Sequence, residues 1–130
     1  AGLLKGYETE ISEIHHSLKK DAPSGTARKI ADIICQVLNK EPKKVIRYGR
    51  AGITEVRPPE EIGIHSLRLG DIVGEHYVYF GGSGEIIEIS HRCYNRESFA
   101  AGALKAASFI KDKPAGLYSM EHIIREMMNV

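Results

Sequence analysis

The sequence contains little cysteine, and this limits the kinds of site it can form. Its two cysteines, Cys35 and Cys93, lie far apart and form no C-x-x-C pair. A zinc ribbon or a dithiol redox site is therefore not expected. The spacing allows either a single Cys35–Cys93 disulfide or two reduced thiols, and reduced thiols in a cytoplasmic protein are the preferred interpretation.

The chain also lacks an excess of charge and any long hydrophobic run. Its formal net charge is +1, so nothing predicts binding to nucleic acid or to an acidic membrane surface. No stretch approaches the roughly 20 apolar residues of a membrane span, and the first residues are too short for a secretory signal. Because the chain begins with Ala1 rather than Met, we expect it to be part of a longer protein.

What is present fits one globular domain covering residues 1–130, because 42% hydrophobic and 27% charged residues are ordinary proportions. The residue pattern predicts strands at 9–16, 45–47, 62–69, 73–80 and 85–92. It predicts helices at 24–39, 96–111 and 119–128, with Ser24 and Ser119 as N-caps. Residues 40–61 are the least regular part, and a long loop there is expected to serve a site or cover a sheet edge.

These elements predict an α+β fold: a mixed sheet of four or five strands with two long helices packed on one face. The last three strands, separated by short glycine-containing turns, favour an antiparallel meander. Ile62 and Ile64 would lie on one face of their strand, and Leu67 on the other. Two apolar faces indicate that the uncovered face meets another copy of the chain, so we expect self-association.

The stretch from Glu10 to Ala27 carries the clearest chemistry. Two histidines, His15 and His16, end a strand, and Lys19 follows in a loop that leads through Ser24, Gly25 and Thr26 into a helix. The first turn of a helix offers free N–H groups to an anion, and histidine can exchange a proton near neutral pH. The pattern fits a carboxylate or phosphate site, although a simple helix cap and surface histidines would look the same.

A metal site is a further alternative, because His65, His76, His91 and His122 are also present. None of these histidines has H-E-x-x-H or comparable spacing, so no metal is expected. A metal-dependent hydrolase remains the least favoured of the functions considered.

The same stretch resembles the signature loop of the 4-hydroxy-tetrahydrodipicolinate (dihydrodipicolinate) reductase family. The matching positions are Glu10, Ile11, Glu13, His15, Lys19, Asp21, Pro23, Ser24, Gly25, Thr26 and Ala27. The resemblance extends through 69–76, 88–104 and 116–120, and it is weakest at 40–61. It implies the substrate-binding and tetramerisation domain of a cytoplasmic enzyme of diaminopimelate and lysine biosynthesis that reduces a cyclic dicarboxylate with NADPH or NADH.

The resemblance also implies roles for single residues. His15 would be the proton donor or acceptor and Lys19 a second proton donor, while His16, Lys19, Ser24, Gly25 and Thr26 would bind the substrate. Family members begin with a Rossmann domain for the cofactor, and residues 1–130 show no pattern of such a domain, so no cofactor-binding residue is expected in this chain. We expect a homotetramer that needs a cofactor domain for turnover; the alternative is a dicarboxylate-binding or assembly module without turnover.

Overall fold

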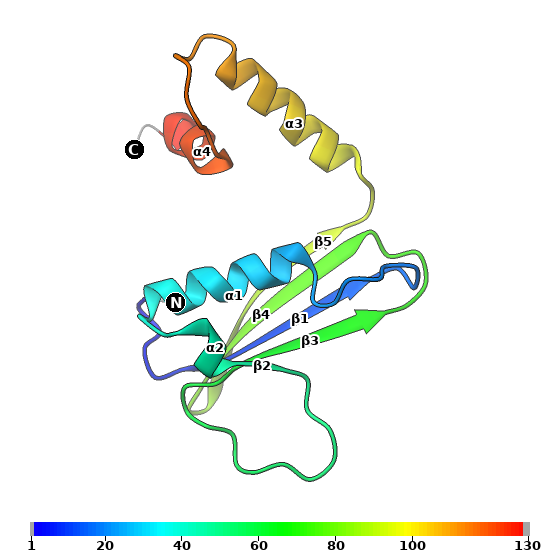
Figure 1. Ribbon diagram of the computed structural model, residues 1–130, viewed down its shortest axis with the longest axis vertical. Helices are drawn as coiled ribbons and strands as arrows, with labels where there is room; N and C mark the ends of the chain where they lie inside the picture. The colour runs from blue at the N-terminus through cyan, green and yellow to red at the C-terminus, as the bar shows by residue number, and fades with distance from the viewer. Residues whose placement is uncertain (1, 129–130) are drawn as a thin grey trace. The chain divides into compact units, whose positions relative to one another are not determined.

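The computed structural model describes residues 2–128, which fall into two compact units. The first unit extends to Tyr94 and the second begins at Asn95. Figure 1 shows the elements of both units along the chain.

The first unit is built on a mixed sheet of five strands in the order β2-β3-β1-β4-β5. Strands β2, β3 and β1 are parallel to one another, and β4 is antiparallel to both of its neighbours, β1 and β5. The strands are β1 Glu8–His15, β2 Ile46–Tyr48, β3 Ile62–Arg68, β4 Gly74–Gly82 and β5 Glu85–Cys93. The prediction of an α+β fold with a mixed sheet is confirmed.

The predicted antiparallel meander of the last three strands is wrong. Only β4 and β5 form a hairpin, because β1 lies between β3 and β4. The segment 69–73 crosses the end of β1, where the N–H groups of His16 and Ser17 donate to the carbonyls of Ile72 (2.7 Å) and Gly70 (3.1 Å). A connection that passes one intervening strand must span about 10 Å, or two strand spacings, which this segment can do and a two-residue turn cannot.

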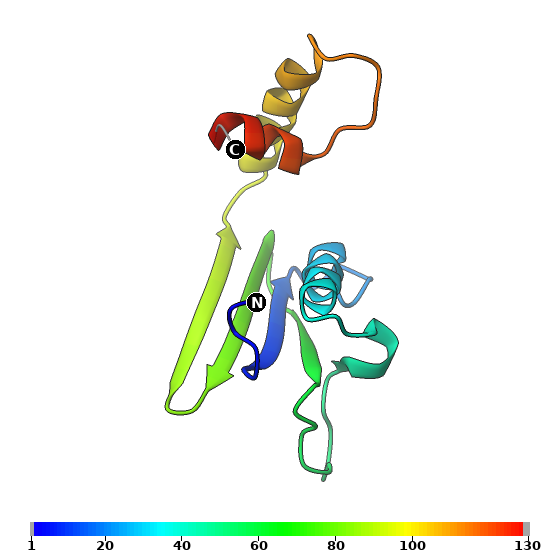
Figure 2. The same ribbon diagram turned by 90° about the vertical axis from the view of Figure 1, so that its left-hand side faces the viewer.

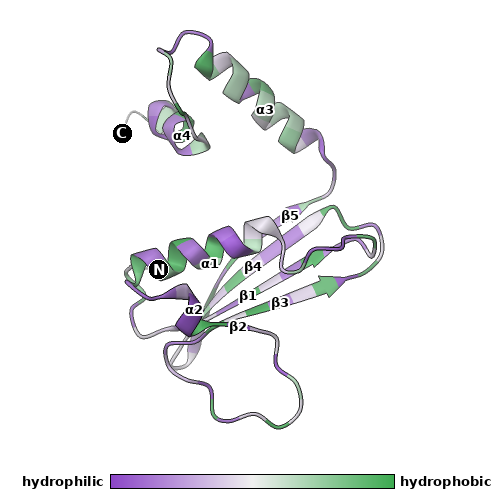
Figure 3. Ribbon diagram, viewed as in Figure 1, coloured by the Kyte–Doolittle hydropathy of each residue, from purple (hydrophilic) through white to green (hydrophobic). Residues whose placement is uncertain are grey.

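Helix α1, Gly25–Val37, covers one face of this sheet (Figure 2). It begins after Ser24, whose side chain accepts a hydrogen bond from the N–H of Ala27 and so caps the helix as predicted. Hydrophobic and hydrophilic residues alternate along α1 with helical period (Figure 3). The apolar stripe and the inward sheet residues form one core, consisting of Ile11, Ala27, Ala31, Ile34, Cys35, Ile62, Ile64, Val78 and Phe80.

Residues 40–61 contain a short helix that the sequence pattern did not predict, α2 at Pro42–Val45. Strand β2 follows it, and residues 49–61 then form a long loop back to β3. Cys35 and Cys93 are both buried and do not form a disulfide.

The second unit contains helices α3, Glu97–Ile110, and α4, Met120–Met128. Both were predicted within one or two residues. Ser119 precedes α4, and its hydroxyl lies 2.9 Å from Nδ1 of His122, one turn into the helix. Among residues 2–128, no helix is long and apolar enough to cross a bilayer.

Candidate active site

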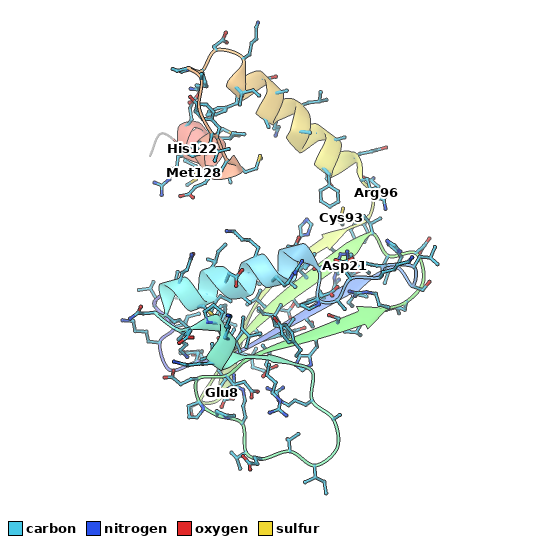
Figure 4. All side chains as sticks on the ribbon, in the orientation of Figure 1. Glu8, Asp21, Cys93, Arg96, His122 and Met128 are labelled. Atoms are coloured by element: carbon cyan, nitrogen blue, oxygen red, sulfur yellow. The ribbon has the colours of Figure 1, made fainter. Side chains whose placement is uncertain are left out.

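The loop between β1 and α1 is held on the sheet by backbone and side-chain contacts. His15 is the last residue of β1, and its carbonyl accepts a hydrogen bond from the N–H of Leu69 (3.0 Å). Arg68, at the end of β3, donates to the carbonyl of Asp21 within the loop (2.7 Å). Figure 4 labels Asp21 near the start of α1 and Glu8 at the opposite end of β1. The site therefore lies at the C-terminal ends of the parallel strands.

Glu13 is the centre of this site, and its side chain is 0% exposed. It lies two residues before His15 on β1, so both side chains point to the same face of the sheet. Its Oε2 is 2.5 Å from Nδ1 of His15 and 2.9 Å from a guanidinium nitrogen of Arg68. Its Oε1 accepts from the other Arg68 nitrogen (2.7 Å) and from the N–H of Ser24 (3.1 Å).

These contacts keep Glu13 ionised. Burial alone raises the pKa of this carboxyl, but hydrogen bonds from Arg68, Ser66, His15 and Ser24 outweigh burial and hold the pKa at about 2. A carboxylate that is both buried and charged needs such a set of donors, because an unpaired buried charge is strongly unfavourable.

The second nitrogen of His15, Nε2, faces Gly74 at the start of β4. A Cβ atom placed on Gly74 would lie 3.0 Å from this nitrogen, so glycine leaves that side of the ring uncovered. The ring of His76 meets His15 edge to face, with centroids 5.2 Å apart. Burial first, and then the neighbouring His15, lower the pKa of His76, which favours its neutral form.

His76 connects the histidine pair to the helix start. Its Nε2 lies 3.0 Å from the hydroxyl of Ser24. That hydroxyl caps α1, and the N–H of Ser24 is already bound to Glu13. The start of the helix is therefore fixed to two side chains of the sheet, one from β1 and one from β4.

Lys19 lies in the middle of the loop, where its Nζ forms an ion pair with Asp21 at 2.7 Å. The hydrogen bond from Lys19 lowers the pKa of Asp21. Lys20, its neighbour in the sequence, is exposed. The ion pair keeps the Lys19 ammonium near the loop backbone that Arg68 also contacts.

The structure places the predicted residues in one region. His15 and Ser24 are joined through Glu13, while His16 is half-buried and begins the loop. Gly25 and Thr26 form the exposed first turn of α1, and a Cβ on Gly25 would meet nothing within 4 Å. Among residues 2–128, no group of three or more His, Cys, Asp or Glu side chains is placed to hold a metal.

Sequence reasoning did not assign Arg68, Gly74 or His76 to the site. A signal existed for His76, which belongs to one of the segments resembling the reductase family. Arg68 gave no signal, because its contact with Glu13 depends on the parallel pairing of β1 with β3, and that pairing was not predicted. Gly74 belongs to the same resembling segment as His76, but its place beside His15 depends on the pairing of β1 with β4, which was not predicted.

Fold and site together define an α+β domain with a carboxylate–histidine pair beside the first turn of a helix. Residues 1–124 match the family described as "Dihydrodipicolinate reductase, C-terminus". The chain belongs to this family.

Individual relatives agree with this assignment. The chain is 53% identical over 126 residues to a 4-hydroxy-tetrahydrodipicolinate reductase from Caldanaerobacter subterraneus, covering 97% of this chain and 49% of the relative. It is 51% identical over 118 residues to one from Anaeromyxobacter sp., covering 91% and 44%. The chain thus spans about half the length of these curated relatives.

A solved structure has the same fold. The dipicolinate-bound dihydrodipicolinate reductase from Paenisporosarcina sp. TG-14 superposes with a TM-score of 0.69 and 31% sequence identity. The match covers 94% of this chain and 47% of that protein.

Proposed function

We propose that this chain is the substrate-binding and catalytic part of an enzyme that reduces 4-hydroxy-tetrahydrodipicolinate to tetrahydrodipicolinate in diaminopimelate and lysine biosynthesis. The observation that carries the proposal is the buried Glu13–His15 contact beside the start of α1, at 2.5 Å, in a chain of this reductase family. A solved relative with dipicolinate bound supports a small cyclic dicarboxylate as the ligand class.

Two groups of residues in the loop are proposed to bind the two carboxylates of the substrate. The N–H groups of Gly25 and Thr26 belong to the first turn of α1, where backbone donors have no partner within the helix and the helix dipole favours an anion. The open space around Gly25 allows a ligand to approach this backbone closely. The Lys19 ammonium and the side chain of His16 are proposed to bind a second polar group of the substrate. The Ser24 hydroxyl, already bonded to the Ala27 N–H and to His76, supports the site by holding the helix start in place.

The reaction removes the 4-hydroxyl as water, adds a hydride at ring carbon 4 and requires a proton. His15 and Lys19 are the proposed proton donors. His15 is held at one ring nitrogen and can exchange a proton at the other, while Lys19 lies in the same loop with its charge balanced by Asp21.

The nicotinamide cofactor, NADPH or NADH, is proposed to bind in the part of the longer relatives that this chain does not match. The described residues do not fit such a site: Gly81-Gly82-Ser83-Gly84 joins the antiparallel strands β4 and β5 and does not open a helix. A cytoplasmic homotetramer, associating through the sheet, completes the proposal.

Calorimetric titration with pyridine-2,6-dicarboxylate tests the site. We expect saturable binding that Lys19→Ala weakens by about ten-fold or more, because a charge-assisted contact is lost, while the matched change Lys20→Ala leaves binding unchanged. Equal effects of the two substitutions would refute the role of Lys19.

Turnover is tested separately. A cofactor domain from a relative, added to this chain, should restore oxidation of NADPH in the presence of substrate. Binding of the dicarboxylate without any turnover would favour the alternative, a dicarboxylate-binding or assembly module.

A further inference from the structure

We infer that Glu13 and Arg68 act together as positioning residues: Glu13 fixes the Nδ1–H tautomer of His15, so that Nε2 is the atom that exchanges a proton with the ligand. This inference rests on the proposed function for its meaning, but the tautomer is a property of the protein alone. The measurement can therefore fail while dicarboxylate binding succeeds, and the reverse is also possible.

Glu13 is surrounded by hydrogen-bond donors. Each of its oxygens has at least two partners, and one of these contacts is to Nδ1 of His15 at 2.5 Å. A carboxylate can only accept, so the neutral imidazole must place its hydrogen on Nδ1 to make this contact. The unprotonated Nε2 is then the basic atom, as in other enzymes where a carboxylate orients a histidine.

Arg68 stabilises the negative charge of Glu13. Its two terminal nitrogens contact both oxygens of Glu13, at 2.9 and 2.7 Å, in the paired geometry that stabilises a carboxylate most strongly. The same guanidinium donates to the carbonyls of Leu67 (2.6 Å) and Asp21 (2.7 Å), which holds it in place. Glu13 therefore stays an anion and cannot take the proton that His15 is meant to exchange.

Glycine at position 74 leaves access to Nε2. A Cβ atom on Gly74 would lie 3.0 Å from this nitrogen. Several ionisable groups from neighbouring elements share this environment, and they come from β1, the loop, β3, β4 and β5: Glu13, Lys19, Asp21, Arg68, His76 and His91. Of these, only Glu13 is hydrogen-bonded to the ring of His15 among the contacts of the described residues.

Nitrogen NMR of the unaltered chain, labelled with ¹⁵N-histidine, tests the inference without any substitution. At about two pH units above the ordinary imidazole pKa, neutral histidine shows distinct shifts for its protonated and unprotonated nitrogens. We expect His15 to be almost entirely in the Nδ1–H form. A dominant Nε2–H form would overturn the inference, whether or not the protein binds dicarboxylate.

Substitution then separates positioning from simple packing. Glu13→Gln keeps the size of the side chain but can present an amide donor to Nδ1, so the His15 signals should change to a mixture or to the other tautomer. Glu10→Gln is the matched control, because Glu10 lies on the same strand with arginine and histidine partners of its own. Glu13→Gln should also lower kcat roughly 10- to 100-fold with little change in KM when a cofactor domain is supplied. An unchanged tautomer in a folded Glu13→Gln protein would contradict the inference.

Gly74→Ala provides a second variant that leaves Glu13 intact. The added methyl group would crowd Nε2, so we expect kcat to fall at least ten-fold with the Nδ1–H tautomer retained. Gly102→Ala, where a Cβ meets nothing within 4 Å, is the control and should leave kcat unchanged. Full activity of Gly74→Ala would show that Nε2 is not the atom facing the ligand.

Discussion

Two of the three glutamates on strand β1, Glu10 and Glu13, have chemically similar partners but serve different purposes. Glu10 points to the face of the sheet opposite α1 and binds Arg50, Arg57 and His65. Glu13 points to the face of α1 and binds Arg68 and His15. In both cases burial raises the pKa, but arginine and histidine donors outweigh it and hold the pKa at about 2.

Glu10 and Glu13 differ in the part of the structure that each carboxylate binds. Arg50 and Arg57 both belong to the loop 49–61, and Arg57 also donates to the backbone carbonyl of Thr9 (3.2 Å). Glu10 therefore fastens a long loop to the sheet. Glu13 instead fixes a single imidazole and the first N–H of a helix start. The same ion-pair chemistry serves the architecture on one face and the proposed catalytic site on the other.

Replacing Glu10 or Glu13 by alanine should have the largest effect on stability, and the loss should differ between the two residues. Glu13→Ala leaves the part-buried Arg68 without its anionic partner and the Ser24 N–H without its acceptor, which costs about 3–5 kcal/mol of unfolding free energy. Glu10 is 28% exposed, so water can replace part of its role and Glu10→Ala should cost about 1–2 kcal/mol. Urea unfolding measures the loss in both variants. A larger loss for Glu10→Ala than for Glu13→Ala would contradict this prediction.

Acid should weaken the contribution of both Glu10 and Glu13 to the stability of the fold. Because the folded pKa of each glutamate is about 2, below its ordinary 4.5, each contributes stability above about pH 4.5 that is lost as the pH falls towards 2. The loss should reach about 2–3 kcal/mol for Glu13 and less for Glu10, where solvent screens the ion pairs.

Urea midpoints measured between neutral pH and about pH 3 follow this loss. Glu13→Gln should flatten the pH dependence more than Glu10→Gln does. A pH dependence that neither substitution changes would show that other groups govern acid unfolding.

The sequence predicted part of the site around Glu13 and nothing of the ion pairs around Glu10. The strand, the Ser24 cap and α1 follow from local patterns, because apolar periodicity and capping depend on residues close in the chain. The residue types of the loop containing His15 and Lys19 indicated an anion site, and the resemblance to a family signature then implied the roles of these two residues. Glu10 and Glu13 belong to the same signature, yet neither was assigned a role, because their partners come from other elements.

Those partners depend on strand order, which local patterns do not determine. Arg68 reaches Glu13 only because β3 pairs with β1 in parallel, and the predicted meander would have placed β3 beside β4 instead. Gly63 lies opposite Glu10 in the same pairing, and its importance also depends on that strand order. A Cβ there would lie 2.0 Å from the Glu10 carboxylate, so the absence of a side chain on β3 makes room for the ion cluster.

The smallest effect tests the loop-fastening role of Glu10. Glu10→Gln weakens the contacts of Arg50 and Arg57, so the loop 49–61 should open more often while the sheet stays folded. A loss of about 1–2 kcal/mol corresponds to roughly 5- to 30-fold faster cleavage by trypsin after Arg50, a site that is followed by alanine. Arg57 precedes Pro58 and should resist cleavage in any variant.

Glu13→Gln is the control for this experiment, because Glu13 has no contact with that loop among the bonds of the described residues. It should leave the cleavage rate after Arg50 unchanged under conditions where the protein remains folded. Equal acceleration in both variants would mean that cleavage follows global unfolding. In that case Glu10 would stabilise the whole sheet rather than one loop. The His15 tautomer would then be the remaining evidence that the two glutamates have different roles.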